Sequence, residues 1–317
     1  MKRASGVLMP VFSLPSKYGI GCFSKEAYKF VDQLKKAGQS YWQILPLGPT
    51  GYGDSPYQSF STYAGNPYFI DLKTLVKEGL LTKKECKEVR CKEQKKIDYE
   101  KIYQNKFKIL KKAYRRFQKN DKYEKFLEEN AFWLEDYCMY MAIKDAHEGK
   151  SWSEWEELLK KREKTALEKV KEELEDEIGF YQFQQYEFDR QWKKLHTYAK
   201  EQGIQIIGDI PIYVAFDSAD AWAAPELFQF DEENNPIRVA GCPPDAFAKT
   251  GQLWGNPLYN WEYHQKTGYA WWIQRIRYCF QRYDVVRIDH FRGFDEYYAI
   301  PYGESTAENG TWMPGPG

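Results

Sequence analysis

Helical periodicity appears first in residues 25–37, "KEAYKFVDQLKKA". Four apolar side chains fall on one helical face: Ala27, Phe30, Val31 and Leu34. Gly38 then marks the expected helix end, and "YWQILPLGPT", residues 41–50, predicts a strand that runs into a Pro/Gly turn. A helix, a short loop and a strand in this order form the unit of an α/β fold.

The α/β pattern resumes near residue 186, after a long interruption. "YEFDRQWKKLHTYAKEQG", residues 186–203, predicts a helix that ends near its glycine. "IQIIGDIPIYVAF", residues 204–216, predicts a buried strand that meets Asp209 and then a turn at Pro211. We therefore expect a second helix and strand of the same fold here.

A third helix and strand follow. "TGYAWWIQRIRYCFQRY", residues 267–283, predicts a helix, and "DVVRID", residues 284–289, predicts the next strand. The aliphatic residues of this strand are expected to be buried: Val285, Val286 and Ile288. The last segment, "YGESTAENGTWMPGPG", has the composition of a loop.

The interruption lies between residues 73 and 180, where Lys and Glu dominate and glycine is scarce. Such sequence predicts solvated helices, and the interleaved acidic residues argue against a basic binding patch. Residues 131–149, "AFWLEDYCMYMAIKDAHEG", are more apolar and are expected to pack the insertion on the main domain. The prediction is a first part over 1–72, a helical insertion over 73–180 and a continuation over 181–317.

Charged residues stand at the ends of the predicted strands. Arg287 and Asp289 are two positions apart, so they share one face of their strand. In a barrel of parallel strands that face is the lumen, and active sites lie at the carboxyl ends of the strands. Asp209 repeats the placement, and "QILPLGPTGYGDSPYQSF", residues 43–60, opens another strand into a polar loop.

Two interpretations of the Arg287 and Asp289 pair stay open at this point. An adjacent guanidinium favours the ionised carboxylate, and an ionised aspartate at a barrel mouth can act as a nucleophile. The alternative is a structural ion pair that ends the strand.

Composition narrows the class of protein. Lys plus Arg and Asp plus Glu both count 46, so the broad positive field of a nucleic-acid binder is absent. No stretch approaches the ~20 apolar residues of a membrane span, and the proline-interrupted N-terminus is a poor signal peptide. We expect a cytoplasmic protein with no nucleic-acid or membrane partner. The six cysteines show no metal-ligand spacing and are expected to be reduced thiols.

Aromatic residues make up 17% of the chain. Large aromatic side chains build cores, but with this many some are expected to line a pocket.

Five segments, in order, together resemble the 4-α-glucanotransferases called amylomaltases or disproportionating enzymes, glycoside hydrolase family 77 of the α-amylase clan. They are "SLPSKYGIG" (13–21), "QILPLGPTGYGDSPYQSFSTYAGNPYFIDL" (43–72), "IIGDIPIYVAFDSADAW" (206–222), "AGCPPDAFAKTGQLWGNPLYNW" (240–261) and "DVVRIDHFRGF" (284–294). The resemblance implies an α/β protein, the N-terminal part of a (β/α)8 TIM barrel with a mostly helical inserted subdomain.

The resemblance also implies roles for individual residues. Asp289 resembles the nucleophile that forms a β-glycosyl-enzyme, with Arg287 orienting it and His290 binding the adjacent sugar. Asp209 resembles the aspartate that organises the substrate site. The remaining glucan contacts implied by the resemblance are Ser55, Tyr57, Asp245, Phe247 and Trp254, with Tyr52 at a second, remote glucan site.

Three of these contacts have plainer alternatives. Trp254 is also compatible with a core position and Tyr57 with an aromatic in a turn. Asp245 follows two prolines and is also a common turn former. The segment from Pro243 to Pro257 resembles the mobile loop that covers the family's cleft.

The expected activity is transfer of α-1,4-glucan segments with retention of configuration, which needs two carboxyl groups ~5 Å apart and no cofactor. In the family the acid/base glutamate and a third carboxylate lie beyond the point where this chain stops. Three later glutamates do not sit in that motif: Glu296, Glu304 and Glu308. We therefore expect the N-terminal part of a longer enzyme, inactive or poorly stable alone. The alternatives are an α-1,4-glucan hydrolase of the same clan and a non-catalytic glucan-binding fragment.

Overall fold

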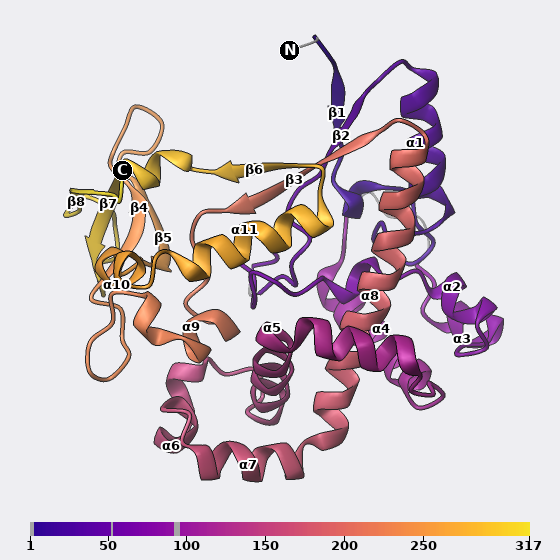
Figure 1. The fold of residues 1–317 in the computed structure, drawn as a ribbon, viewed down its shortest axis with the longest axis horizontal. Helices are drawn as coiled ribbons and strands as arrows, with labels where there is room; N and C mark the ends of the chain where they lie inside the picture. Colours follow the sequence, from indigo (N-terminus) through magenta and orange to yellow (C-terminus); the bar gives the residue numbers. More distant parts are fainter. Residues whose placement is uncertain (1–2, 52, 92–95) are drawn as a thin grey trace.

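A parallel sheet of four strands lies at the centre of the fold. The computed structural model describes residues 3–51, 53–91 and 96–317. The strands are β1 (Gly6–Leu8), β2 (Tyr41–Gln43), β3 (Gln205–Pro211) and β6 (Val285–Asp289), and they pair in the order β1-β2-β3-β6. The helices that lead into the last three strands are α1 (Lys25–Lys36), α8 (Glu175–Glu201) and α11 (Ala270–Arg282). The predicted α/β unit is thus confirmed three times (Figure 1).

The chain between β2 and β3 is helical, as the Lys/Glu-rich composition predicted. Its helices are α2 (Leu72–Lys77), α3 (Lys83–Glu88), α4 (Tyr99–Tyr114), α5 (Asp121–Ala146), α6 (Glu157–Lys160) and α7 (Lys164–Glu173). α8 follows without a break across residue 180. The apolar part of α5 joins one core with the segment after β3, so the prediction that residues 131–149 pack on the main domain is confirmed.

A second sheet was not predicted from the sequence. Its antiparallel strands are β4 (Arg238–Cys242), β5 (Gln252–Pro257), β7 (Glu296–Pro301) and β8 (Thr311–Pro314), in the order β5-β4-β7-β8. Two short helices connect strands of the two sheets: α9 (Ala219–Ala223) lies between β3 and β4 in the sequence, and α10 (Trp261–Lys266) lies between β5 and α11. The predicted loop at the end of the chain is confirmed for residues 302–310 but is wrong for residues 311–314, which form β8. There Trp312 lies opposite Tyr298 of β7 and packs on its ring.

The burial of β6 also differs from the prediction. Val285 is 37% exposed, and Val286 and Ile288 are only partly buried. β6 is an edge strand of the parallel sheet, so among the described residues no strand covers its outer side. β3 has neighbours on both sides, and its Ile206 and Ile210 are buried as expected.

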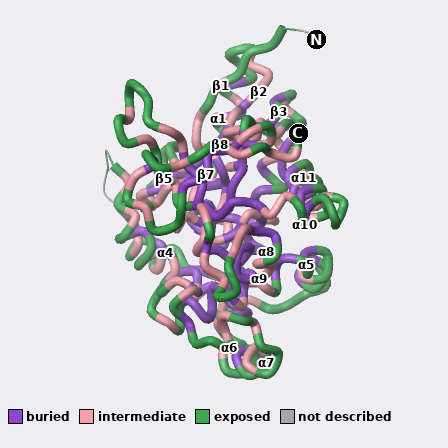
Figure 2. The backbone as a smooth tube through the Cα atoms, turned by 90° about the vertical axis from the view of Figure 1, so that its left-hand side faces the viewer, coloured by how far each residue is buried: buried purple, intermediate pink, exposed green. Residues whose placement is uncertain are grey.

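Two large apolar cores hold these layers together. One lies between α1, α8 and the parallel sheet, and the other joins α5, the segment after β3 and the second sheet. Figure 2 shows the buried segments running through the middle of the molecule, with α6 and α7 exposed at one end. All six cysteines are free thiols in the part of the chain that the structure describes. Among the described helices, none is long and apolar enough to cross a bilayer.

Candidate active site

Arg287 joins two aspartates at the carboxyl ends of β3 and β6. It lies directly opposite Asp209 in the pairing of the two strands. Its Nη1 donates to both carboxylate oxygens of Asp209 at 2.7 and 2.6 Å, and its Nη2 donates to Oδ1 of Asp289 at 2.6 Å. The hydroxyl of Tyr57 donates to Oδ2 of Asp209 at 2.7 Å. Four predicted site residues therefore form one connected cluster.

The charges in this cluster depend on each other. Burial raises the pKa of Asp209, while hydrogen bonds from Tyr57 and Arg287 act to lower it. Burial and the hydrogen bond to Asp209 raise the pKa of Tyr57 to about 12, so its hydroxyl stays a donor at neutral pH. The hydrogen bond to Asp209 raises the pKa of Arg287 further above its usual value. A permanent cation therefore faces both carboxylates.

His290 follows Asp289 directly and turns the chain out of β6. It has a left-handed backbone with φ of 53°, which is uncommon for a residue with a side chain. Its ring lies edge-on to Trp254 at 4.9 Å and faces Tyr213 at 6.4 Å. Burial lowers the pKa of His290, and its Nε2 has no hydrogen-bond partner among the described residues. A neutral imidazole with a free nitrogen is suited to a hydroxyl ligand.

The loop after β2 carries Tyr57 to the cluster. Ser55 Oγ accepts the backbone N–H of Tyr57 at 3.3 Å, so here Ser55 shapes the turn. Gln58 Nε2 donates to Asn256 Oδ1 at 3.0 Å and connects this loop to β5, which also carries Trp254. The prediction for Tyr52 concerns a position outside the described residues.

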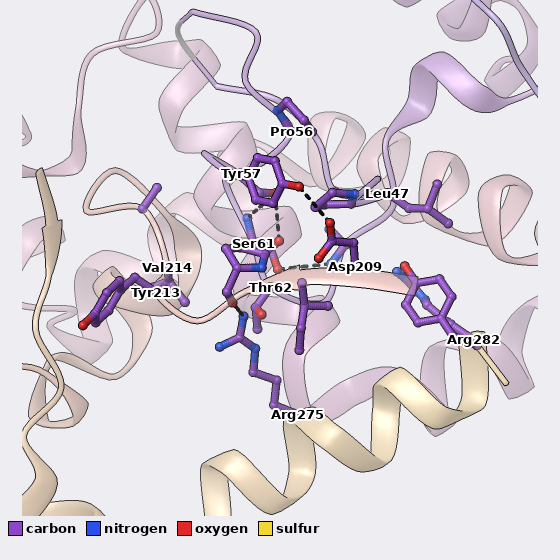
Figure 3. Close-up of a pocket in the computed structure, with 18 residues that line it drawn as sticks. Leu47, Pro56, Tyr57, Ser61, Thr62, Asp209, Tyr213, Val214, Arg275 and Arg282 are labelled. Atoms are coloured by element: carbon purple, nitrogen blue, oxygen red, sulfur yellow. Dashed lines mark hydrogen bonds between the residues drawn. The ribbon is translucent and has the colours of Figure 1, made fainter. Parts of the chain in front are cut away.

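A small cavity lies behind Asp209, as Figure 3 shows. It measures about 40 Å³, far below the ~300 Å³ at which ligand pockets begin. Its lining includes Tyr57, Ser61, Asp209, Arg275 and Arg282. The cavity therefore belongs to the packing around Asp209 and is not a sugar cleft. Among the described residues no cluster of three or more potential metal ligands occurs.

The comparisons with known proteins identify the family of this chain. The family model for 4-α-glucanotransferases, glycoside hydrolase family 77, matches residues 9–317. The chain belongs to glycoside hydrolase family 77. The 4-α-glucanotransferase of Clostridium butyricum is 51% identical over 97% of this chain and 64% of its own length, and that of Aquifex aeolicus is 50% identical over 99% and 64%. This chain thus spans about 64% of the length of these curated relatives.

Solved structures show the family 77 fold as well. The amylomaltase from Streptococcus agalactiae in complex with acarbose superimposes with a TM-score of 0.96 at 44% identity, over 99% of this chain and 65% of that one. The amylomaltase from Corynebacterium glutamicum has a TM-score of 0.78 at 18% identity, which extends the likeness in fold alone. The expected α/β fold is therefore that of the amylomaltases.

Two predicted contacts of the family 77 cleft stand apart from the Arg287 cluster. Asp245 Oδ1 accepts the backbone N–H groups of Phe247 at 2.8 Å and Ala248 at 2.6 Å, which is the geometry of a turn former. The Phe247 side chain is 99% exposed. The segment after them is not all loop, because residues 252–257 form β5. The mobility of the segment and a glucan contact at Asp245 or Phe247 stay predictions.

The later glutamates have partners of their own. Glu296 pairs with Arg292, Glu304 accepts from Asn309 at 3.2 Å, and Glu308 accepts from Thr306 at 3.0 Å. Among the described contacts none of them reaches Asp289. No family 77 acid/base is therefore assigned to them.

Three residues near the cluster were missed by the sequence reasoning: Tyr213, Gln58 and Asn256. Tyr213 stacks between Tyr259 and the pair of Trp254 and His290. The available signal was its place four residues after Asp209, just beyond the end of a strand. Gln58 and Asn256 meet across nearly 200 positions, and neither lies in a pattern that points to the other.

Proposed function

We propose that this chain carries the glycosyl-transfer site of a 4-α-glucanotransferase, which moves α-1,4-glucan segments between maltooligosaccharides. The observation that carries the proposal is the single guanidinium of Arg287 held between Asp209 and Asp289 at the ends of adjacent parallel strands. Membership of family 77 supports the same reaction.

In the proposed reaction Asp289 is the nucleophile. One of its carboxylate oxygens bonds to the anomeric carbon as the bond from that carbon to the leaving 4-oxygen breaks, and the leaving oxygen takes a proton from an acid. The 4-hydroxyl of a second glucan then attacks the same carbon, loses its proton to the conjugate base and releases Asp289. The acid/base is assigned to no residue of this chain. Arg287 donates to Oδ1 of Asp289 and thereby orients the carboxylate for attack.

The surrounding side chains bind the sugar in this proposal. The buried Nε2 of His290, which has no partner among the described residues, binds a sugar hydroxyl in this proposal, and Trp254 places a half-buried ring beside it. On the side of Arg287 away from Asp289, Asp209 accepts hydrogen bonds from Arg287 and from the hydroxyl of Tyr57. The S. agalactiae amylomaltase was solved with acarbose, which supports an α-glucan as the ligand of this site too.

The test is incubation with maltotriose followed by chromatography of the products. It is run on this 317-residue chain and on the product of the whole reading frame that encodes it, each with Asp289→Asn as the control. A transferase makes glucose together with oligomers longer than maltotriose, and the control makes neither.

The other outcomes separate the alternatives. Products no longer than maltotriose indicate a hydrolase. Binding of acarbose without any product from either form of the protein indicates a glucan-binding protein. Absence of both product and binding in both forms contradicts the proposal.

A further inference from the structure

The segment from Ile212 to Asp217, which follows β3, is irregular, yet its first residues are buried behind the cluster. Ile212, Tyr213 and Val214 are all at least 95% buried. Buried backbone outside a helix or sheet must find other hydrogen-bond partners. Here the partners are side chains, because Asn256 Nδ2 donates to the carbonyl of Val214 at 2.7 Å and Trp152 Nε1 donates to that of Phe216 at 2.8 Å.

Arg275 of α11 holds the beginning of this segment. Its Nη2 donates to the carbonyl of Pro211 at 2.5 Å and its Nη1 donates to that of Ile212 at 2.8 Å. These are the carbonyls at which β3 ends, two and three residues beyond Asp209. One rigid guanidinium thus fixes two consecutive peptide groups, a geometry that a lysine does not reproduce.

The burial of Arg275 is costly and therefore informative. The residue is 1% exposed, and no described carboxylate lies within salt-bridge distance of it. Its guanidinium lies over the ring of Trp272 at 4.8 Å. An apolar side chain would fill this space without the cost of a buried charge. What the arginine adds is the double hydrogen bond to the end of β3.

Tyr259 connects Arg275 and the end of β3 to the aromatic residues beside His290. Its hydroxyl donates to the carbonyl of Ile212 at 2.7 Å and lies 3.3 Å from Nη1 of Arg275. Its ring stacks on Tyr213 at 5.9 Å. Tyr213 in turn lies 6.4 Å from both Trp254 and His290. A continuous set of contacts therefore joins Arg275 to the rings of Tyr213, Trp254 and His290, which we call the aromatic wall beside Asp289.

We propose that Arg275, with Tyr259, is a positioning residue of the glucan site. By fixing the carbonyls of Pro211 and Ile212 it sets both the carboxylate of Asp209 and the ring of Tyr213 that backs the sugar-binding wall. The effect of Arg275 on ligand affinity rests on the proposed function, whereas its effect on the position of the Tyr213 and Trp254 rings does not.

The experiment compares Arg275→Lys with Arg282→Lys. Arg282 is a matched control because it also lies buried on α11, two turns later, and also lines the cavity behind Asp209, but its side chain donates to Tyr278 of its own helix and not to the end of β3. Tyr259→Phe is a milder second variant that keeps the ring and removes the hydroxyl. Three quantities are measured: the melting temperature, the affinity for acarbose by fluorescence titration, and the fluorine resonance of 5-fluorotryptophan at Trp254, assigned with Trp254→Phe.

We expect Arg275→Lys to weaken acarbose binding about tenfold and to move the Trp254 resonance, with a smaller effect of the same kind from Tyr259→Phe. Arg282→Lys lowers the melting temperature to a similar extent but leaves the resonance unmoved and the affinity within about twofold.

Equal effects of the two lysine variants on binding and on the resonance would overturn the positioning role, as would an unmoved Trp254 resonance in Arg275→Lys. If neither the 317-residue chain nor the product of the whole reading frame binds acarbose, the proposed function fails, and the Trp254 resonance alone decides whether Arg275 positions the wall.

Discussion

The two aspartates held by Arg287 differ in their access to solvent. Asp209 is 1% exposed, whereas the side chain of Asp289 is 41% exposed. A buried carboxylate with two hydrogen-bond donors is held in place, and an open one can reach a ligand. The geometry therefore supports an organising role for Asp209 and a reacting role for Asp289.

Arg287→Gln is expected to move the acid limb of the transfer activity to higher pH. Burial already raises the pKa of Asp209, and the cation opposes that effect. Without the cation the pKa of Asp209 rises further, so Asp209 takes up a proton at a higher pH as the pH falls. Activity that depends on the ionised cluster is then lost earlier on acidification. The measurement is the rate of maltotriose disproportionation between about pH 4 and pH 8.

Arg190→Gln provides the matched control for this prediction. Arg190 also bridges two carboxylates, those of Glu78 and Glu187, with distances of 2.6 Å, but it lies on α8. Its replacement leaves the acid limb in place. An equal movement in both variants would mean that the effect arises from general destabilisation.

The sequence predicted part of the site for a clear physical reason. The two-residue period of a strand puts Arg287 and Asp289 on one face, and the structure confirms their contact. The bond from Arg287 to Asp209 depends on the register between two strands 78 positions apart, which no local pattern contains. The placement of Tyr213 depends in the same way on Tyr259 and Trp254.

At the scale of the elements, α5 secures the segment that follows β3. Lys144 Nζ donates to Asp217 Oδ2 at 2.6 Å, and the hydroxyl of Tyr140 donates to the other oxygen at 2.5 Å. Lys144 is nearly buried, and Asp217 is about one-third exposed. The helical insertion is therefore joined to the segment after β3 by a partly desolvated ion pair.

Lys144→Met is expected to destabilise the protein by about 2 kcal/mol, because Asp217 loses its partner but can still reach some solvent. Lys169→Met, which removes an exposed pair with Glu173 on α7, is the control and is expected to cost less than about 0.5 kcal/mol. Urea denaturation measures both. If the two substitutions cost the same, the pair on α5 does not secure the segment.

The elements that the sequence predicted are those with a long regular period. The helices α1 and α11 were located to within a turn, whereas α8 begins at Glu175, well before the predicted start at residue 186. The strands that these helices lead into followed from continuous apolar runs. The second sheet has strands of four to six residues that include glycine, proline and arginine. Such strands exist because of their pairing with each other, so periodicity alone does not reveal them.

At the scale of the whole molecule, an apolar surface lies open along α11 and β6. We call it the open apolar surface and define it by four exposed side chains: Ile273, Phe280, Val285 and Phe291. It borders a groove that includes Trp272 and Phe294, and β6 presents a free edge there in the described structure. Exposed apolar surface beside an unpaired strand edge favours association.

We therefore expect this 317-residue chain to self-associate as its concentration rises, which light scattering after size-exclusion chromatography measures. Phe280→Glu places a charge on the open apolar surface and is expected to lower the average mass towards that of a single chain. Leu158→Glu changes an equally exposed side chain on α6 and leaves the association unchanged. A single-chain mass at every concentration for the unsubstituted protein would contradict the expectation.

The insertion between β2 and β3 also determines when the site can assemble. These strands are hydrogen-bonded neighbours, although residues 44–204 separate them along the chain. Closing so long a loop costs conformational entropy before any pairing repays it, and contacts of this range slow folding. A compact insertion shortens the effective loop, because the chain soon after β2 is held to α8, which leads into β3. The backbone N–H groups of Gly65 and Asp71 donate to Gln185 and Gln191 of α8, both at 2.7 Å. The cluster around Arg287 is then completed only after the helical insertion has folded, so the rate at which the cluster forms during refolding depends on helices that contribute no residue to it.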